Sequence, residues 1–309
     1  MRGLRALWIG AIIAAPLDAQ RSPDSTASPR VPELIAPTRC DACAAWNEPT
    51  RPFRIHGNTW YVGTRGLSAL LVTSPTGHVL IDAALPESAP LIAASIRALG
   101  FRLEDVKVIL NSHAHYDHAG GLAALQRSTG ATVALHPWSA RVVRLGATLE
   151  DDPQFGPYVP FPGLRDVREI RDGEVLNVGE LALTAHFTGG HTPGGTTWTW
   201  RSCDAAGDCV YVVYADSQTP IGDDSFRFSS NTRYPAVLAD FERGHARIEA
   251  LDCDVLVTPH PGLVALFDRE AKRAAGDVGA FREPNACRSY VAAARQRLAD
   301  RLSQERSRE

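Results

Sequence analysis

Short hydrophobic runs separated by turn residues mark most of the first half of the chain. The turn Ser74-Pro75-Thr76-Gly77 lies between two of these runs, and 106–110 is an apolar, β-branched run that predicts a buried strand. A helix is predicted from Pro86 to Leu99, because apolar residues recur on one face and Gly100 follows as a helix end. The strands predicted here are 59–63, 68–73, 78–82, 106–110 and 132–136.

The second half repeats this mixture of strands and helices. Strand patterns resume at Val167 and continue through Trp200 and Val213, and a further apolar strand is predicted at 254–257. Helices are predicted at 235–251, 263–276 and from Pro284 onward, and Pro137 starts another helix beside His136, which could cap it. Two sets of strands, each followed by helices, predict an α/β protein.

Residues 147–162 interrupt this periodicity. The segment is rich in proline and glycine and carries aromatic side chains, among them Phe155 and Tyr158. Long loops without secondary structure are uncommon in compact domains unless they serve a function. We therefore expect a functional surface loop between the two halves.

A dense group of ligand-type residues follows the buried strand 106–110. His113, His115, Asp117 and His118 lie within the stretch from Ser112 to Gly121. In an extended segment, His113, His115 and Asp117 would share one side, and His118 would reach a neighbouring position after a turn. Neutral imidazoles and carboxylates are zinc ligands. The alternative interpretation is a histidine-rich surface loop.

Two more histidines occur in similar settings. His191 lies in Gly189-Gly190-His191-Thr192-Pro193 after the strand-like run 181–187, and His260 lies between two prolines after the run 254–257. Alone, each could be an ordinary loop histidine. Together with the first group they supply five histidines and one aspartate, enough for two Zn²⁺ ions with three protein ligands each.

The motifs His113-x-His115-x-Asp117-His118, Gly190-His191-Thr192-Pro193-Gly194 and Pro259-His260-Pro261 resemble the metallo-β-lactamase superfamily. Within it, the chain resembles the subclass B3 enzymes from about Trp46 to about Tyr290, with segments such as Tyr214-Ala215-Asp216-Ser217. The resemblance implies a four-layer αβ/βα sandwich with zinc at one edge, between two sheets. It implies a first metal site of His113, His115 and His191 and a second of Asp117, His118 and His260.

The resemblance also implies a reaction. A hydroxide produced at the metals would attack the β-lactam carbonyl, and Asp117 would be both a ligand and the group that orients the nucleophile. Ser217 and Thr219 would approach the substrate carboxylate, with Thr219 in place of the usual serine; the alternative for this pair is a plain turn. The family often supplies a tyrosine from the next loop, and 221–226 contains none.

Two other functions stay open at this point. A lactonase, a glyoxalase II-like thioesterase or a phosphodiesterase of the same fold would often use an additional bridging aspartate, and Asp216 is close to that position in the chain. The resemblance to subclass B3 implies that Asp216 points away from the metals. The third possibility is a secreted zinc-binding protein without catalysis, which the full set of six ligands disfavours.

The N-terminus has the order of a secretory signal. Arg2 and Arg5 precede the apolar run 6–15, and small residues follow up to Ala19. The run is too short to span a bilayer, and the alternative is a buried N-terminal helix. We expect a signal peptide at 1–19, a leader at 20–45 and the metallo-β-lactamase domain at 46–309. The expected location is the periplasm, without a membrane anchor.

Charge and cysteine content agree with this prediction. The formal charge of −3 gives no sign of a nucleic-acid partner, and the expected partner is a small β-lactam molecule bound by a monomer. Six cysteines in an exported protein suggest disulfides. Cys203 and Cys209 flank a predicted turn and could staple a hairpin, and the resemblance implies a Cys253–Cys287 bridge. Cys40 and Cys43 could form a tight loop or a redox or metal CxxC motif.

Overall fold

Strands and helices alternate in this computed structural model, which describes residues 38–156 and 159–307. The expected signal peptide at 1–19 and most of the expected leader lie outside the described residues. In the described part, Thr38 donates hydrogen bonds to the Glu87 carboxylate from its backbone nitrogen and from its hydroxyl, both at 2.9 Å. No helix of this described part is both long and apolar enough to cross a membrane.

The strands of the described part form two sheets. The first has the order β1-β2-β3-β4-β5-β6-β7 and the second β12-β11-β10-β9-β8. The first sheet comprises β1 (Phe53–His56), β2 (Thr59–Tyr61), β3 (Leu70–Val72), β4 (His78–Ile81), β5 (Val106–Leu110), β6 (Thr132–Leu135) and β7 (Arg168–Glu169). The second comprises β8 (Val175–Val178), β9 (Leu181–Phe187), β10 (Thr196–Cys203), β11 (Cys209–Tyr214) and β12 (Val255–Val257).

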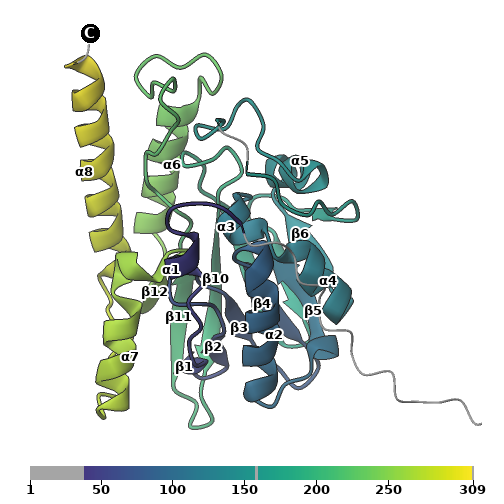
Figure 1. The fold of residues 1–309 in the computed structure, drawn as a ribbon. Helices are drawn as coiled ribbons and strands as arrows, with labels where there is room; N and C mark the ends of the chain where they lie inside the picture. Colours follow the sequence, from purple (N-terminus) through teal and green to yellow (C-terminus); the bar gives the residue numbers. More distant parts are fainter. Residues whose placement is uncertain (1–37, 157–158, 308–309) are drawn as a thin grey trace, which may run out of the picture. The chain divides into compact units, whose positions relative to one another are not determined.

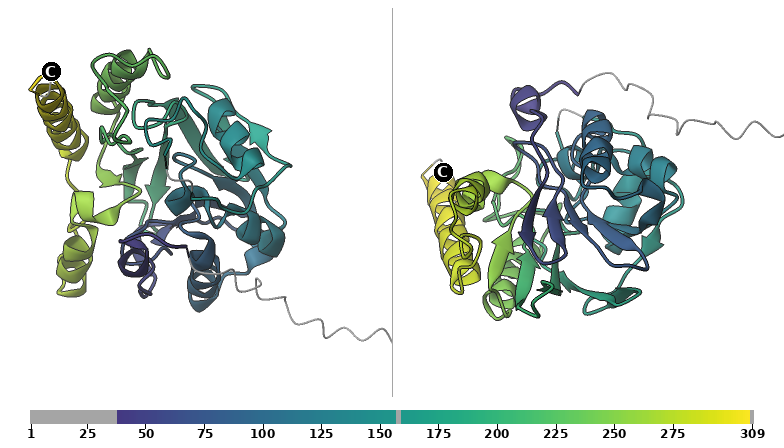
Figure 2. Two further views of the ribbon diagram at one scale, coloured as in Figure 1. Left: turned by 45° about the horizontal axis from the view of Figure 1, so that its top comes forward. Right: turned by 90° about the horizontal axis from the view of Figure 1, so that it is seen from below.

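Helices cover the outer face of each sheet. Figure 1 shows α2, α4 and α5 on one side of the strands and α6, α7 and α8 on the other, and Figure 2 shows the same layers from two more directions. This arrangement confirms the predicted four-layer α/β sandwich. The helices are α1 (Cys43–Trp46), α2 (Ala89–Ala98), α3 (Tyr116–Ala119), α4 (Leu122–Thr129), α5 (Pro137–Leu145), α6 (Val237–Glu249), α7 (Leu266–Ala274) and α8 (Ala286–Arg306), with 3-10 turns η1 (Pro86–Ser88), η2 (Leu103–Asp105) and η3 (Pro261–Val264).

The central strands are apolar on both faces because each face meets a different core. In β4, Val79 and Ile81 pack in the core between the two sheets, whereas Leu80 packs under the helices. The next strand, β5, pairs parallel with β4, with Leu80 opposite Ile109. Parallel strands covered on both sides therefore appear in the sequence as continuous apolar runs. Their carboxyl ends meet at one edge, where the ligand-type residues follow.

The chain begins its first sheet earlier than predicted. Strand β1 pairs antiparallel with β2, with Phe53 opposite Tyr61. The segment was not predicted as a strand because it is short, follows Pro52 and contains the exposed Arg54. The prediction of His136 as a cap is confirmed, since its Nδ1 accepts a hydrogen bond from the Trp138 backbone nitrogen at 3.0 Å. That bond satisfies a free N–H in the first turn of α5.

All six cysteines are paired. Cys203 and Cys209 face each other across β10 and β11, which confirms the hairpin staple. The bridge Cys253–Cys287 joins the segment before β12 to the start of α8, as the family resemblance implied. Cys40–Cys43 closes a tight loop at α1, where Cys43 is buried in the core. This pairing selects the tight loop over a metal-binding CxxC motif.

Candidate metal centre

The loop after β5 supplies four of the six predicted ligands. His113 and His115 lie in the irregular segment that follows β5, whereas Asp117 and His118 lie in the short helix α3. The expected alternation of an extended chain therefore ends at His115. Because the chain turns into a helix there, Asp117 does not join the two preceding histidines. It lies with His118 and His260 instead.

His191 and His260 reach the same edge from the second sheet. His191 lies in the turn between β9 and β10, and His260 follows β12 at the start of η3. Glycine at 195 is needed in this turn, because a Cβ there would lie 2.3 Å from Asp216 Oδ2. The local sequence Thr188 to Gly195 thus combines a ligand-type histidine with a backbone that other polar groups approach closely.

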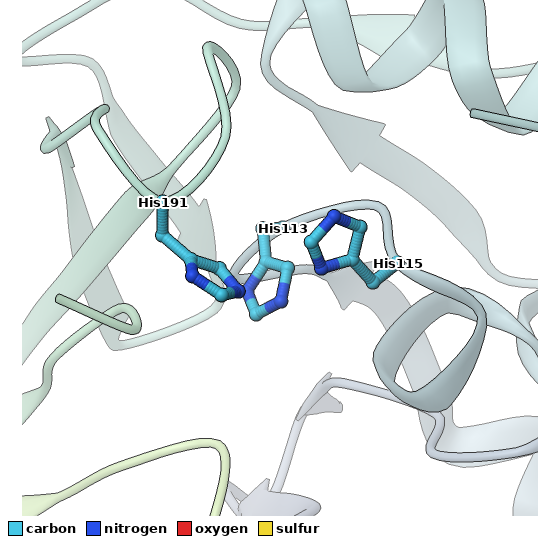
Figure 3. Close-up of side chains that lie close together, drawn as sticks. All are labelled: His113, His115 and His191. Atoms are coloured by element: carbon cyan, nitrogen blue, oxygen red, sulfur yellow. The ribbon is translucent and has the colours of Figure 1, made fainter. Parts of the chain in front are cut away.

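The structure brings the six residues into two groups. His113, His115 and His191 form one, and Asp117, His118 and His260 form the other; within each group the possible ligand atoms lie within 4.8 Å of one another. Figure 3 shows the three imidazoles of the first group converging from two loops. The groups are adjacent, since the rings of His113 and His118 have centroids 4.4 Å apart. Either group could hold a metal ion.

Each histidine of the first group has one ring nitrogen engaged by an oxygen acceptor. His113 Nδ1 lies 2.8 Å from Asp216 Oδ1, and His191 Nδ1 lies 2.8 Å from the carbonyl oxygen of Thr219. His115 Nε2 lies 3.1 Å from Asp152 Oδ2. A histidine that donates one N–H to such an acceptor keeps the lone pair of its other nitrogen for a metal. The acceptors therefore select the ligand tautomer of all three rings.

The remaining nitrogens fit a metal. His113 Nε2 and both ring nitrogens of His118 are buried without a hydrogen-bond partner among the described residues. Buried polar atoms of that kind are costly unless a partner satisfies them. The two other nitrogens of the first group, His115 Nδ1 and His191 Nε2, have only long contacts, with the Gln154 amide nitrogen at 3.5 Å and 3.4 Å. A bound cation would satisfy these lone pairs more fully.

Electrostatics keep most of these groups in the form that binds metal. Burial, followed by the neighbouring His118, holds the pKa of His113 well below its usual range, and burial with the nearby His115 lowers the pKa of His191 to about 3. Burial alone would raise the pKa of Asp117, but His118 and His260 together outweigh it and hold that pKa well below its usual range. For His115, burial is outweighed by the Asp152 carboxylate, which raises the pKa; a metal would have to displace that proton.

In the second group, one carboxylate oxygen lies near both histidine rings. Asp117 Oδ2 lies 3.2 Å from His118 Nε2 and 3.4 Å from His260 Nε2. The indole of Trp46 covers His260, with ring centroids 5.2 Å apart. His260 is the most exposed of the three side chains. This group therefore opens toward solvent on the side where a ligand would enter.

A buried carboxylate supports the whole ligand loop. Asp82 accepts hydrogen bonds from the Ser112 backbone nitrogen at 2.7 Å and from the Asn111 side chain at 2.9 Å. Its second oxygen accepts from the Tyr214 hydroxyl at 2.7 Å. Because Asp82 is fully buried and has a φ of 63°, its surroundings must hold it in place. The network fixes the start of the loop relative to β11.

A cavity of about 530 Å³ opens beside both groups. Ser217 and Thr219, the predicted substrate-binding residues, line it together with residues of the 147–162 loop. Ser217 is buried, and the Thr219 hydroxyl lies 3.1 Å from His191 Nδ1. The lining consists of Trp46, His115, Tyr116, Asp117, Thr148, Gln154, Val159, His191, Ser217, Thr219, Ile221, Gly222, Asp223, His260 and Leu263. The size suits a small organic molecule.

Sequence reasoning missed several residues of this site. Asp152 and Gln154 lie in the irregular loop that was predicted to be functional, but no motif distinguished them from its other polar residues. The sequence marks Trp46 only as the start of the domain and Asp82 only as the end of a strand. A fully buried aspartate is hard to recognise in a sequence, because its partners Asn111 and Tyr214 come from distant segments.

Comparison with known proteins identifies the family. Residues 62–260 match the family model described as the metallo-beta-lactamase superfamily, and the chain belongs to that superfamily. The Rm3 metallo-beta-lactamase is 53% identical over 87% of this chain and 99% of its own, with a TM-score of 0.85. MEM-A1, a subclass B3 metallo-beta-lactamase from a soil metagenome library, is 47% identical over 85% of this chain and 100% of its own, with a TM-score of 0.83. Within the superfamily, the chain is a subclass B3 enzyme.

Curated relatives match a smaller part of the chain. A probable metallo-hydrolase of Burkholderia pseudomallei is 30% identical over 59% of this chain, and a hydroxyacylglutathione hydrolase of Anaeromyxobacter dehalogenans is 32% identical over 43%. The matches span 60% and 41% of those two proteins.

Proposed function

We propose that the chain is an exported zinc β-lactamase that hydrolyses the amide bond of β-lactam antibiotics and so confers resistance to them. The observation that carries the proposal is the pair of ligand groups at the edge of a cavity of about 530 Å³. The subclass B3 neighbours, which align over most of the chain, support it. The signal-like N-terminus and the paired cysteines support a periplasmic location.

Two Zn²⁺ ions are the proposed cofactors. His113, His115 and His191 would hold one ion, and Asp117, His118 and His260 the other. Imidazole nitrogens with a single carboxylate oxygen make a typical donor set for zinc. When bound, zinc lowers the pKa of water to about 7 and polarises a carbonyl oxygen.

Asp117 has the central role among the residues of the chain. Its pKa lies well below the usual range, so it is a carboxylate at neutral pH. Oδ2 faces His118 and His260, which leaves Oδ1 to accept a proton from a water molecule between the two groups. A carboxylate in this position would orient the attacking oxygen toward the carbonyl carbon of the substrate, and such orientation contributes to the rate. No side chain needs to form a covalent intermediate.

Ser217 and Thr219 would bind the carboxylate of the substrate. The backbone carbonyl of Thr219 is the shorter acceptor for His191 Nδ1, at 2.8 Å against 3.1 Å for the hydroxyl. The hydroxyl proton therefore remains free to donate into the cavity. The lining includes Trp46, Tyr116, Val159, Ile221 and Leu263, whose apolar surfaces would accept the substituents of the antibiotic.

The alternative is a lactonase or a glyoxalase II-like thioesterase. The curated hydroxyacylglutathione hydrolases favour it by sequence. The position of Asp216 speaks against it, because this aspartate engages His113 Nδ1 and, among the described residues, belongs to neither ligand group. A bridging aspartate would have to face both groups.

The test is a direct comparison of substrates. The purified mature protein, loaded with zinc, is assayed with a chromogenic cephalosporin, a lactone and a glutathione thioester. We expect the highest kcat/KM for the cephalosporin. Higher kcat/KM for the lactone or the thioester would overturn the proposal and place the chain with the alternative. The Asp117→Ala protein serves as the matched inactive control.

A further inference from the structure

The last turn of helix α8 contains a buried acidic residue that no step of the proposed reaction uses. Glu305 is 2% exposed although it lies close to the end of a surface helix. Its Oε1 accepts a hydrogen bond from the Phe228 backbone nitrogen at 3.0 Å, and its Oε2 accepts one from the Ser229 backbone nitrogen at 2.9 Å. Buried carboxylates are rare unless they are fully paired.

Arg301 completes this pairing from one helical turn earlier. Its Nε donates to Glu305 Oε1 at 2.8 Å, and its Nη2 donates to the carbonyl oxygen of Phe226 at 3.0 Å. The guanidinium also lies over the Phe228 ring, 5.3 Å from its centroid. Two side chains of α8 thus bind the backbone of residues 226–229, which forms no helix or strand of its own.

The same helix also holds the start of this loop. The Tyr290 hydroxyl donates to the carbonyl oxygen of Asp216 at 2.9 Å and accepts from the Gln218 backbone nitrogen at 3.0 Å. Residues 290 and 305 are roughly 22 Å apart along the helix axis. Figure 1 shows the C-terminal end of α8 beside the loop that precedes α6. Helix α8 therefore holds the loop at two points, and the segment 219–225 spans the interval between them.

The spanning segment forms one wall of the cavity. Thr219, Ile221, Gly222 and Asp223 line it, and none of them is held by α8 directly. The Asp223 backbone nitrogen donates to the Pro153 carbonyl oxygen at 2.8 Å, next to Gln154, which also lines the cavity. Next along the chain, Phe226 and Phe228 form a small apolar cluster with Phe241, against which Leu298 and Leu302 of α8 pack. A shift at 226–229 would thus reach the wall 219–225 and, through Asp223, the segment that carries Gln154.

We propose that Glu305 and Arg301 are positioning residues for substrate binding, acting through the backbone of 226–229 on the cavity wall 219–225. This inference rests on the proposed function. Most metal ligands do not depend on the pair, because their supports are Asp216, Asp152 and Asp82. Only His191 contacts the wall, through the carbonyl oxygen of Thr219. That end of the wall follows Gln218, which Tyr290 holds independently of Glu305 and Arg301. The pair therefore governs KM, while metal content and the chemical step stay as they are.

The experiment compares Glu305→Ala, Glu305→Gln and Arg301→Met in the full mature protein. The matched control is Asp300→Ala, which removes the same charge from the exposed face of α8, where Asp300 contacts only Gln296 among the hydrogen bonds of the described residues. Each protein is measured for zinc per chain, for kcat and KM with a chromogenic cephalosporin, and for amide hydrogen exchange of residues 219–229.

Glu305→Ala should raise KM roughly tenfold with kcat changed less than about threefold, as expected when only binding is lost. Zinc per chain should match the wild type, and the amides of 219–229 should exchange faster. Glu305→Gln keeps one acceptor oxygen and should restore part of the KM. If Glu305→Ala does not fold, Glu305→Gln and Arg301→Met decide the result by the same criteria.

A fall in kcat in proportion to lost zinc, with KM unchanged, would overturn the proposal, because it would mean that the pair only stabilises the fold. Unchanged KM and unchanged exchange in all three variants would also overturn it. A wild type that does not hydrolyse the cephalosporin would contradict the proposed function instead. In that case the amide hydrogen exchange of residues 219–229 decides alone: faster exchange in the Glu305 and Arg301 variants supports their positioning role, and unchanged exchange overturns it.

Discussion

At the scale of single residues, the ligand-type side chains depend on acceptors from remote parts of the chain. Asp216 and Asp152 lie 103 and 37 residues from the histidines that they orient. The ligands could be predicted from spacing and from the family resemblance, because they cluster in motifs. The role of their acceptors could not. The sequence presents Asp216 only as a possible bridging ligand, and Asp152 has no spacing that distinguishes it from a solvated aspartate.

The orienting role of Asp216 gives the first prediction. Asp216→Ala should weaken zinc affinity by about 10- to 100-fold, the usual effect of removing an acceptor behind a metal-binding histidine. At saturating zinc the stoichiometry should match the wild type, whereas His118→Ala should lose one ion. Asp216→Asn, which keeps an acceptor oxygen for His113 Nδ1, is the control. Competition with a zinc chelator measures the affinity, and loss of an ion at saturation in Asp216→Ala would indicate a bridging ligand.

Asp117 and His118 share a group but should differ in their effect on turnover. Both Asp117→Ala and His118→Ala remove one ligand of the second group and should bind less zinc. Asp117→Ala also removes the carboxylate that orients the attacking water, so its kcat should fall by at least about 100-fold. The kcat of His118→Ala should fall less than that of Asp117→Ala. Steady-state hydrolysis of one cephalosporin with metal analysis tests this, and equal losses in kcat would argue against an orienting role.

At the scale of elements, the sequence predicted most strands and helices, because the two-residue period of strands and the 3.6-residue period of helices are both strong in this chain. The main differences lie where an element is short: β1 was not predicted, and α3 replaces the end of an expected extended segment. A helix of four residues has no period to detect, and its position depends on bonds such as that from the Ala83 backbone nitrogen to the His118 carbonyl oxygen. Tertiary contacts therefore decide the geometry of the ligand loop.

The disulfide between the β12 segment and α8 should contribute to stability. Cys253 and Cys287 are 34 residues apart, so the bridge should stabilise the fold by about 4 kcal/mol in the chain-entropy model. The Cys203–Cys209 bridge closes a separation of 6 residues and should contribute about 2 kcal/mol. The measurement is the free energy of unfolding of the two double Cys→Ser proteins. The chain-entropy model is contradicted if removal of the Cys203–Cys209 bridge lowers the free energy of unfolding as much as removal of the Cys253–Cys287 bridge.

The cap of α5 predicts a pH dependence of stability. Burial lowers the pKa of His136 to about 4, against the opposing charges of Asp172 and Asp240. The unfolded chain therefore takes up this proton near pH 6.5, before the folded protein does, and stability falls between about pH 6.5 and pH 4. A pKa shift of this size corresponds to a loss of at most about 3 kcal/mol in the free energy of unfolding. The actual loss should be smaller, because the His136 ring is partly exposed.

The substitution His136→Asn isolates that contribution. Asparagine keeps an acceptor for the Trp138 N–H but does not titrate in this range. The variant should therefore match the wild type near pH 7 and lose less stability than the wild type toward pH 4. Denaturant unfolding at several pH values measures the difference. Parallel pH profiles for the two proteins would exclude His136 as the source.

At the scale of the whole molecule, the two sheets meet at the edge where the two ligand groups lie. The first sheet supplies His113, His115, Asp117 and His118, and the second supplies His191 and His260. Bound metal would thus connect the two halves of the sandwich. Each group unites residues from both halves. Catalysis and the mutual position of the sheets should consequently depend on the same ions.

Removal of metal should therefore abolish activity and lower thermal stability together. Dialysis against a chelator should eliminate cephalosporin hydrolysis and lower the melting temperature, because ligands that bind only the folded state stabilise it. Addition of zinc should restore both. Covalent inhibitors directed at serine β-lactamases should have no lasting effect, since no serine is acylated. Activity that persists after metal analysis shows the zinc to be gone would rule out the proposed chemistry, and a stable melting temperature on zinc loss would show that the sheets hold together without it.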